Sequence, residues 1–511
     1  MSVPLPVFIA IPLATAFLLP MFGKKGKSAA TLLANLAVLS LLVLAIRCVG
    51  QSGVYEIGKW PIPLGINLVL DGLSSLLLLA ISVVSTAAVL FSIRYMERYT
   101  AKSKYFSLFL LMVAGMNGVV LSGDMFNLFV FLEIASLASY ALVGFGCEHE
   151  ELEASFKYMV LGSIGSIFIL FGVALVYGNT GTLNMAYVSR TIQQAGLNAG
   201  LAFALALFVA GFGLKAALVP FHAWLPDAHP SAPAPISAML SGILIKTLGV
   251  YALTRVVFNV FGILPSTGWL LVVLGLLSMV TGAFLAFGQW DLKRLLAYSS
   301  ISQIGYVVLG IGLGGLILAR AGDNPSPAEL AWASLAFLGG LFHLVNHAVY
   351  KALLFLTSGS VEMATGTRQM RQMGGLAERM PVTRTTCTVA SAAIVGIPPF
   401  SGFWSKLILV WAAIQADFIW VAAIIVSVSL GTLIMYLKVQ RYVFLGELPE
   451  NLQQTEENSS SMLLPMIALA CLCVFMGLLV LVPSLKANIL DPAVQALTAG
   501  VTYSDAVIGM R

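Results

Sequence analysis

Residues 211–230, GFGLKAALVPFHAWLPDAHP, contain the feature that decides the fold, a lysine at the end of a long apolar run that prolines interrupt. Proline lacks a backbone hydrogen-bond donor and clashes with the preceding helical turn, so the sequence predicts a broken helix after Lys215. In a membrane, the free backbone groups of such a break are tolerated only where they line a polar cavity. The meaning of this stretch therefore depends on whether the chain lies in a membrane.

The composition of the chain answers that question. Of the 511 residues, 59% are hydrophobic and 10% are charged, whereas soluble domains carry about 25% charged residues. Apolar runs of about 20 residues, long enough to cross a bilayer as helices, recur from end to end. The sequence lacks the short segments of alternating polarity that are typical of a transmembrane barrel. We therefore expect a single all-α polytopic membrane domain that covers residues 1–511.

The apolar runs predict about fourteen transmembrane helices. Lys and Arg residues gather at the ends of these runs, about 16 on one side and about 7 on the other, and the richer side is expected to be cytoplasmic. This distribution favours an even number of spans with both termini outside, in a cell inner (plasma) membrane. Arg255 counts among the outer loop residues and Lys293 among the cytoplasmic ones. The expected spans are approximately 5–21, 28–47, 73–94, 106–121, 125–145, 154–177, 199–219, 235–255, 268–288, 296–318, 331–357, 385–413, 419–442 and 462–483.

Five Lys and Glu residues lie inside the predicted spans and are not counted in any loop. They are Glu133, in the run FNLFVFLEIASLASYALVG, and four lysines, Lys215, Lys246, Lys351 and Lys406. Each would cost about 2.5–3.5 kcal/mol at the centre of a lipid-exposed helix, so they are expected to face protein or water. Lys351 could also reach the interface by snorkelling, but the side chain of Glu133 is too short to do so. We interpret the other four as functional groups.

A second predicted break is similar to the first. In GIPPFSGFWSK, residues 396–406, Pro398, Pro399 and Gly402 precede Lys406. Paired interruptions in the two halves of a chain are typical of transporters with inverted repeats. Because the breaks fall in the seventh and twelfth predicted spans, five apart, we expect two inverted five-helix repeats. The first covers spans 4–8, residues 106–255, and the second covers spans 9–13, residues 268–442.

Two histidines and a lysine recur every four residues in FHLVNHAVYKALLFL, residues 342–356. This spacing places His343, His347 and Lys351 along one helix face. Two histidines so spaced could bind zinc, but the first is not followed by the glutamate of the metalloprotease motif. A proton relay is the preferred interpretation, because histidine titrates near neutral pH.

Three further residues are secondary candidates for ion translocation. His222 and His229 follow the first break, and Asp71 opens the third span, where a helix cap and a functional role are equally consistent with the sequence. The five cysteines are isolated or lie within apolar runs. They do not form a ligand framework, so we expect this chain to bind no metal and no cofactor.

Several long stretches of the chain resemble those of one family. They are GFGLKAALVPFHAWLPDAHPSAPAPISAMLSGILIKTLGVYALTR, DLKRLLAYSSISQIGYVVLGIG, HAVYKALLFLTSGSV and GIPPFSGFWSK. The chain is similar to the antiporter-like proton-pumping subunits of respiratory complex I, to the D subunit of Mrp-type sodium/proton antiporters and to related subunits of membrane-bound hydrogenases. The resemblance runs from about residue 65 to 445, and it implies fourteen helices with an inverted five-helix repeat.

The resemblance also implies roles for the buried charges. Glu133 and Lys215 match the charge-switching pair of the family, and Lys246 matches the lysine that links its two half-channels. Lys406 matches a lysine at the terminal exit, where some complex I members have glutamate, so it favours the antiporter D type. The long lateral helix of the distal complex I subunit is not recognisable in this sequence. The remaining matches are to polar residues of the eleventh helix, namely His343, His347 and Lys351.

The sequence therefore predicts a proton-translocating, and alternatively sodium-translocating, subunit in which protons pass from the Glu133–Lys215 pair through Lys246 and the histidines to Lys406. The expected partners are other membrane subunits, the lipid bilayer and the ions themselves, without nucleic acid. A stand-alone carrier of an organic solute is the alternative, although the polar groups are titratable and strung along the chain. A redox enzyme would need cofactor ligands, and a structural anchor would not need buried lysines. The sequence shows no catalytic chemistry of its own, and it leaves open the parent complex and the direction of transport.

Overall fold

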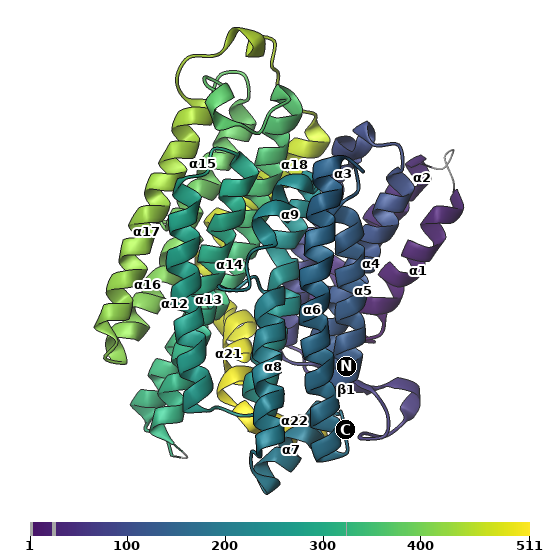
Figure 1. The fold of residues 1–511 in the computed structure, drawn as a ribbon, viewed down its shortest axis with the longest axis vertical. Helices are drawn as coiled ribbons and strands as arrows, with labels where there is room; N and C mark the ends of the chain where they lie inside the picture. Colours follow the sequence, from purple (N-terminus) through teal and green to yellow (C-terminus); the bar gives the residue numbers. More distant parts are fainter. Residues whose placement is uncertain (1–3, 23–26, 323, 511) are drawn as a thin grey trace.

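The computed structural model describes residues 4–22, 27–322 and 324–510 (Figure 1). Long helices run roughly along the vertical axis of the view and form one bundle, with connecting segments at its two ends. Both ends of the chain lie in the lower half of the view. The predicted all-α membrane fold is confirmed by this bundle.

The chain begins with two helices, a β-hairpin and a third helix. The hairpin is antiparallel and pairs Gly53 with Leu70. The third helix begins after Asp71 because the side chain of Asp71 accepts from the backbone N–H of Ser74 while the hydroxyl of Ser74 accepts from the backbone N–H of Asp71. These elements are α1 (Val7–Leu18), α2 (Lys27–Cys48), β1 (Gly53–Glu56), β2 (Asn67–Leu70) and α3 (Gly72–Tyr95).

The next part of the chain contains the first break. Helix α8 ends at Lys215, and the chain passes through turns at residues 216–224 before α9 begins. The helical segment after α9 is largely π-helical. The elements are α4 (Lys102–Leu121), α5 (Met125–Val143), α6 (His149–Thr180), α7 (Met185–Ala195), α8 (Ala199–Lys215), α9 (Leu225–Ser231), α10 (Ala234–Met239), η4 (Leu240–Tyr251), α11 (Ala252–Thr254) and η5 (Arg255–Val260).

The remaining part contains the second break, at which the predicted span 385–413 divides into two half-helices, α15 and α16. Its helices are α12 (Pro265–Phe287), α13 (Leu292–Ala321), α14 (Pro327–Thr365), α15 (Pro381–Val395), α16 (Ser401–Gln415), α17 (Ile419–Val439), α18 (Ser460–Phe475), α19 (Leu478–Leu481), α20 (Pro483–Leu485), α21 (Asp491–Thr498) and α22 (Tyr503–Gly509). Shorter helical turns lie at Leu19–Phe22, Ile57–Lys59, Met96–Arg98, Met370–Gln372, Gln440–Phe444, Glu450–Leu452, Lys486–Leu490 and Gly500–Thr502.

Within the described ranges, eleven helices are long and apolar enough to cross a membrane. Two shorter apolar helices, Val7–Phe22 and Ala199–Lys215, coincide with the first and seventh predicted spans. The multi-pass membrane character of the chain is thus confirmed. The total of fourteen spans and the two inverted repeats, residues 106–255 and 268–442, stay predictions.

The centre of the bundle is formed by the segments Ala234–Val260 and Leu292–Ala321, whose apolar stretches are completely buried. Helices α2, α6 and α17 instead expose much of their apolar surface, as lipid-facing helices do. Small residues bring α12 and α13 close together. A Cβ atom on Gly282 would lie 2.5 Å from the backbone nitrogen of Ser302, and one on Gly305 would lie 2.5 Å from that of Met279. These two helices therefore pack backbone against backbone.

The two ends of the bundle differ in character. Loops 144–148, 288–291 and 366–380 meet at one end, where Asp291 pairs with Arg368. We call this end the basic side, because its loops belong to the set in which Lys and Arg predominate. The opposite end, here called the hairpin side, carries β1, β2 and the C-terminal helices, and Arg190 of α7 pairs there with Asp505 of α22.

Candidate ion-translocation site

Glu133 and Lys215 face each other between α5 and α8. The Nζ of Lys215 lies 3.7 Å from Oε1 of Glu133 and donates hydrogen bonds to the hydroxyls of Ser136, at 3.0 Å, and Tyr140, at 3.2 Å. These three partners of Lys215 follow one another at helical spacing on α5, so they line one face. The hydroxyl of Ser166 donates to Glu133. Because the side chain of Lys215 is 4% exposed and that of Glu133 is 27% exposed, a buried cation meets a more accessible carboxylate.

Two side chains, one from the break itself and one from α12, complete the backbone hydrogen bonding of the first break. The indole N–H of Trp224 donates to the carbonyl oxygen of Leu214 at 3.0 Å. The backbone N–H of Val219 donates to the hydroxyl of Ser278, on α12, at 2.9 Å. These contacts hold Lys215 in the last turn of α8, where the negative end of the helix dipole favours a cation.

Lys246 lies in the π-helical segment η4 and is fully buried. Its Nζ donates to the carbonyl oxygen of Ser241 at 2.6 Å. Three residues further along η4, Gly249 packs against Ala216, the residue that follows Lys215. A Cβ atom on Gly249 would lie 2.4 Å from the Cα of Ala216. The helix that carries Lys246 therefore touches the first break directly.

His343 is held on both sides by hydrogen bonds in the second part of the chain. Its Nδ1 lies 2.9 Å from the hydroxyl of Ser405, on α16, and its Nε2 lies 3.1 Å from the Oε1 of Gln303, on α13. The ring of His347, one turn along α14, is stacked on it with the ring centroids 6.5 Å apart. Both histidines are completely buried.

Lys351 continues the same face of α14 and is also completely buried. Its Nζ donates to the carbonyl oxygen of Leu296 at 2.8 Å and to the hydroxyl of Ser299, both on α13. The snorkelling interpretation of Lys351 is therefore wrong, because its ammonium group is directed at a neighbouring helix inside the bundle. In contrast, neither ring nitrogen of His347 has a hydrogen-bond partner among the described residues.

Lys406 lies at the second break. Its Nζ donates to the carbonyl oxygens of Ile394, at 2.9 Å, and Val395, at 3.0 Å, which are the last residues of α15. Lys406 thus occupies the negative end of a half-helix. Gly402 allows α16 to begin here, since a Cβ atom at this position would lie 1.8 Å from the carbonyl oxygen of Ala393.

The secondary histidines differ in their surroundings. His222 is partly buried in the turns of the first break. His229, on α9, is completely buried, and its ring packs against that of Phe355 of α14 with the centroids 4.7 Å apart. Both of its ring nitrogens lack hydrogen-bond partners in the part of the chain that the structure describes.

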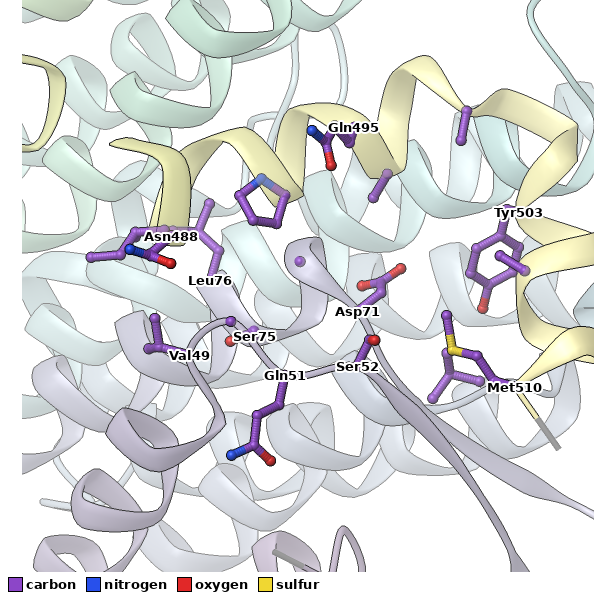
Figure 2. A pocket seen from close by; sticks show the side chains of 18 of the residues that line it. Val49, Gln51, Ser52, Asp71, Ser75, Leu76, Asn488, Gln495, Tyr503 and Met510 are labelled. Carbon is purple, nitrogen blue, oxygen red and sulfur yellow. The ribbon is translucent and has the colours of Figure 1, made fainter. Parts of the chain in front are cut away.

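Asp71 lies apart from these residues, on the hairpin side. It caps α3 and pairs with Arg255, whose Nη1 lies 2.7 Å from its Oδ2. Burial acts to raise the pKa of Asp71, but the charge of Arg255 and the hydrogen bonds from Arg255 and Ser74 bring this pKa below its ordinary value. A cavity of about 340 Å³ opens beside it, with Asp71 and Tyr503 on its wall (Figure 2). This geometry supports the cap, and it corrects the placement of Arg255 in a loop, because Arg255 is buried in η5.

The structure brings most of the predicted residues into one connected region. Lys246 lies within electrostatic range of His343, His347 and Lys351, and Lys406 lies within range of His343. The partners of these residues, such as Ser136, Tyr140 and Gln303, were not identified from the sequence. Only Ser136 and Tyr140 carry a signal, namely their helical spacing from Glu133. Among the described residues, no group of three or more His, Cys, Asp or Glu side chains is arranged to hold a metal ion.

Family models match most of the chain. A model described as NADH:quinone oxidoreductase/Mrp antiporter, TM, matches residues 122–321 and 329–432. A second, described as NADH-Ubiquinone oxidoreductase (complex I), chain 5 N-terminus, matches residues 56–106. Together these matches contain the two breaks and all the buried charges described above.

Individual proteins are similar to this chain over nearly its whole length. The D subunit of the Na(+)/H(+) antiporter of Alkalihalophilus pseudofirmus is 33% identical over 475 residues, which is 92% of each chain. The N subunit of the NADH-quinone oxidoreductase of Desulforudis audaxviator is 34% identical over 492 residues, or 93% of this chain and 94% of that protein. A chain in the solved structure of the Mrp complex from a Dietzia species superimposes with a TM-score of 0.88 at 30% identity and covers all of both chains.

Proposed function

The chain belongs to the family of antiporter-like transmembrane subunits that NADH:quinone oxidoreductases and Mrp antiporters share, and from this premise we propose that it translocates protons, with Na+ as a second candidate ion. It does so as one subunit of a multi-subunit membrane complex, since its relatives are named as subunits. A stand-alone carrier finds no support among these relatives. The observation that carries the proposal is the contact between the buried cation of Lys215 and the carboxylate of Glu133 at a helix break.

Lys215 has two sets of partners, and the exchange between them is the switching step of the proposal. At 3.7 Å, the contact with Glu133 is longer than a hydrogen bond, while the hydroxyls of Ser136 and Tyr140 lie within bonding distance. A nearby carboxylate favours the charged form of a buried lysine, and its withdrawal favours loss of the proton. Movement of Glu133 relative to Lys215 therefore controls whether Lys215 keeps its proton.

From Lys215 the proton passes to Lys246, then along His347 and His343 and on to Lys406. The contact between Gly249 and Ala216 supports the first step, because it joins the helix of Lys246 to the break. The unpartnered ring nitrogens of His347 support the middle of the path, since buried polar groups normally bond to protein or to ordered water. We place the basic side in the cytoplasm and both termini outside a plasma membrane, on the distribution of Lys and Arg.

Replacement of Glu133 by Gln tests the proposal. In vesicles that contain the reconstituted complex, Glu133→Gln should slow ion-driven proton movement by about 100-fold, the order of effect that a positioned proton-transfer group has. Glu378→Gln serves as the matched control, because Glu378 is an exposed carboxylate in a loop of the basic side. Transport by Glu133→Gln at the rate of the control would reject the proposed role of the pair.

A further inference from the structure

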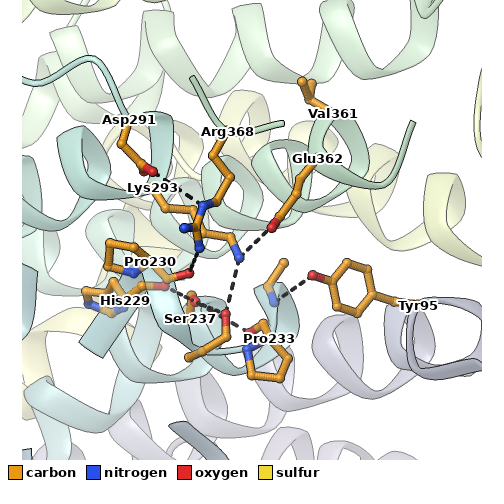
Figure 3. A network of polar contacts seen from close by, with 12 residues as sticks. Tyr95, His229, Pro230, Pro233, Ser237, Asp291, Lys293, Val361, Glu362 and Arg368 are labelled. Carbon is orange, nitrogen blue, oxygen red and sulfur yellow. Dashed lines mark hydrogen bonds and ion pairs between the residues drawn. The ribbon is translucent and has the colours of Figure 1, made fainter. Parts of the chain in front are cut away.

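A polar network on the basic side joins the two halves of the chain (Figure 3). Lys293, at the start of α13, donates to the carbonyl oxygen of Ala232 at 3.2 Å, and Arg368, after α14, donates to the carbonyl oxygen of Pro230. Both carbonyls lie at the end of α9, where backbone acceptors are left free and cations are favourable. The sequence placed Lys293 in a loop, but its side chain is 2% exposed.

The cations of this network are paired with carboxylates at different depths. The Nζ of Lys293 lies 2.8 Å from Oε2 of Glu362, which is 19% exposed. Arg368 lies nearer the surface, with its Nε 3.3 Å from Asp291 and its Nη2 3.7 Å from Glu150, which is 82% exposed. The side chain of Arg368 is 27% exposed, so it lies nearer the solvent than the paired Lys293 and Glu362.

Three cavities surround the side chain of Arg368. Their volumes are about 350, 600 and 470 Å³, and Ser231 and Arg368 line all three of them. Glu362 lines two of the cavities, and Lys293 lines one of these. Each cavity has room for several water molecules. Arg368 therefore lies on the wall that the three cavities share, and we call these cavities together the vestibule.

Between Glu362 and Lys351, further polar groups lie on α14 and beside it. Eleven residues separate the two on α14, which is three helical turns or about 16 Å, so both lie on one face. Ser358 lies between them, and the ring of His229 packs on Phe355 at 4.7 Å. The hydroxyl of Ser358 and both ring nitrogens of His229 are buried without hydrogen-bond partners within the described ranges. Buried polar groups of this kind normally bond to ordered water.

We propose that Glu362 and Lys293 form the mouth of a water-filled proton entrance, and that Arg368 is its gate. The entrance leads to Lys351 and so joins the row of buried residues along α14, which consists of Lys351, His347 and His343. The entrance passes Ser358 and His229. It lies in the second half of the chain, apart from the Glu133–Lys215 pair. This inference rests on the proposed function, because an entrance is needed only if the row carries protons.

A purely structural clamp is the competing explanation. The bonds from Lys293 and Arg368 to the carbonyls at the end of α9 would hold the first break in place. That explanation accounts for the two cations, but it does not require a vestibule beside Glu362 or unpaired groups at Ser358 and His229. The two explanations differ in whether water reaches Ser358.

Cysteine labelling of the reconstituted complex tests the entrance. In a Cys147→Ser, Cys471→Ser background, which removes the exposed thiols of this chain's described residues, Ser358→Cys should react with a small charged methanethiosulfonate added on the basic side. Addition of Arg368→Gln should speed the labelling of this cysteine about tenfold. The substitution removes a charged hydrogen bond that holds the entrance closed, and the loss of one such bond shifts the opening equilibrium by about this factor. Ser360→Cys is the matched control, because Ser360 is completely buried two residues away, with its hydroxyl 2.9 Å from that of Thr383. Reaction of Ser358→Cys no faster than that of Ser360→Cys would overturn the proposal.

If the complex that carries Arg368→Gln does not assemble, a transport measurement on another variant tests the entrance. Glu362→Gln leaves Arg368 in place and should lower proton movement about tenfold, whereas Glu378→Gln should not. Unchanged transport by Glu362→Gln would contradict the entrance. The outcomes also separate the two proposals. If Glu133→Gln is inactive and Ser358→Cys does not react, only the entrance is rejected. If Glu133→Gln is active, the proposed function is rejected, whatever the labelling shows.

Discussion

Gly249 of η4 lies directly against Ala216, the first residue after α8. A Cβ atom on Gly249 would approach the backbone nitrogen and the Cα of Ala216 to 2.4 Å, so the two backbones are in contact without a side chain between them. Lys246 and Lys215 lie three residues and one residue away from this contact. A change in the geometry of the break therefore reaches the helix of Lys246, because close-packed backbones cannot move independently.

Replacement of Gly249 by Ala tests this contact. The added methyl group must displace backbone, so we expect the free energy of unfolding to fall by about 1–3 kcal/mol and transport to decrease. Gly178→Ala is the control, because a Cβ atom at that position of α6 meets nothing within 4 Å. Thermal unfolding of the purified complex and proton movement in vesicles measure the two effects. Equal behaviour of the two variants would show that the contact is not tight.

His347→Phe separates a functional histidine from a structural one. Because neither ring nitrogen of His347 has a hydrogen-bond partner among the described side chains, an apolar ring of similar size removes no hydrogen bond to protein, and the free energy of unfolding should change by less than about 1 kcal/mol. If His347 carries protons, the same variant should lose transport. A protein of nearly unchanged stability and lower activity is therefore expected. A variant that is both destabilised and fully active would contradict both parts of this expectation.

The sequence predicted the deep charges because they conflict with their surroundings. Glu133 and Lys215 each interrupt an apolar run, and the prolines after Lys215 break a helix wherever they occur in its interior. The position of the second break followed in the same way from Pro398 and Pro399. Sequence reasoning therefore located these buried charges and the two breaks, while their roles in transport stay predictions.

The partners of those charges could not be predicted, because they depend on how helices face one another. Arg255 and Lys293 stand near the ends of apolar runs, where a loop and a buried position give the same pattern. The structure pairs Arg255 with Asp71, 184 residues away, and Lys293 with Glu362. Gln303 and Ser405, which hold His343, are ordinary polar residues in apolar runs and are distinguished only by the packing of α13, α14 and α16.

Replacement of Asp71 by Asn should destabilise the protein without removing its transport. Arg255 is 2% exposed, so the substitution leaves a buried guanidinium without its counter-charge. Loss of one partner of a buried ion pair costs about 3–5 kcal/mol. A double variant with Arg255→Met should recover part of this loss. Transport per folded molecule that falls as far as in Glu133→Gln would contradict the structural role of Asp71.

The titration of Asp71 also determines how the stability lost in Asp71→Asn depends on pH. Its pKa is lowered in the folded protein, so the pair contributes fully above the unfolded pKa of Asp, about 3.9. The contribution is lost only as the pH falls below that value through the folded pKa. The difference in unfolding free energy between the parent and Asp71→Asn should therefore be constant in neutral and alkaline buffers. A difference that changed between about pH 6 and 9, far above the ordinary pKa of Asp, would identify another titrating group.

Replacement of Lys406 by Arg distinguishes a cation that closes the second break from one that exchanges a proton. The Nζ of Lys406 bonds to the carbonyl oxygens of Ile394 and Val395, and a guanidinium has enough donors to do the same. Arginine keeps its charge at any physiological pH, so Lys406→Arg should remain folded but lose transport by about 100-fold. Lys406→Met should lose transport and, since the two carbonyls then lack donors, stability as well. If Lys406→Arg transports at the rate of the parent, Lys406 stabilises the end of α15 and takes no part in proton transfer.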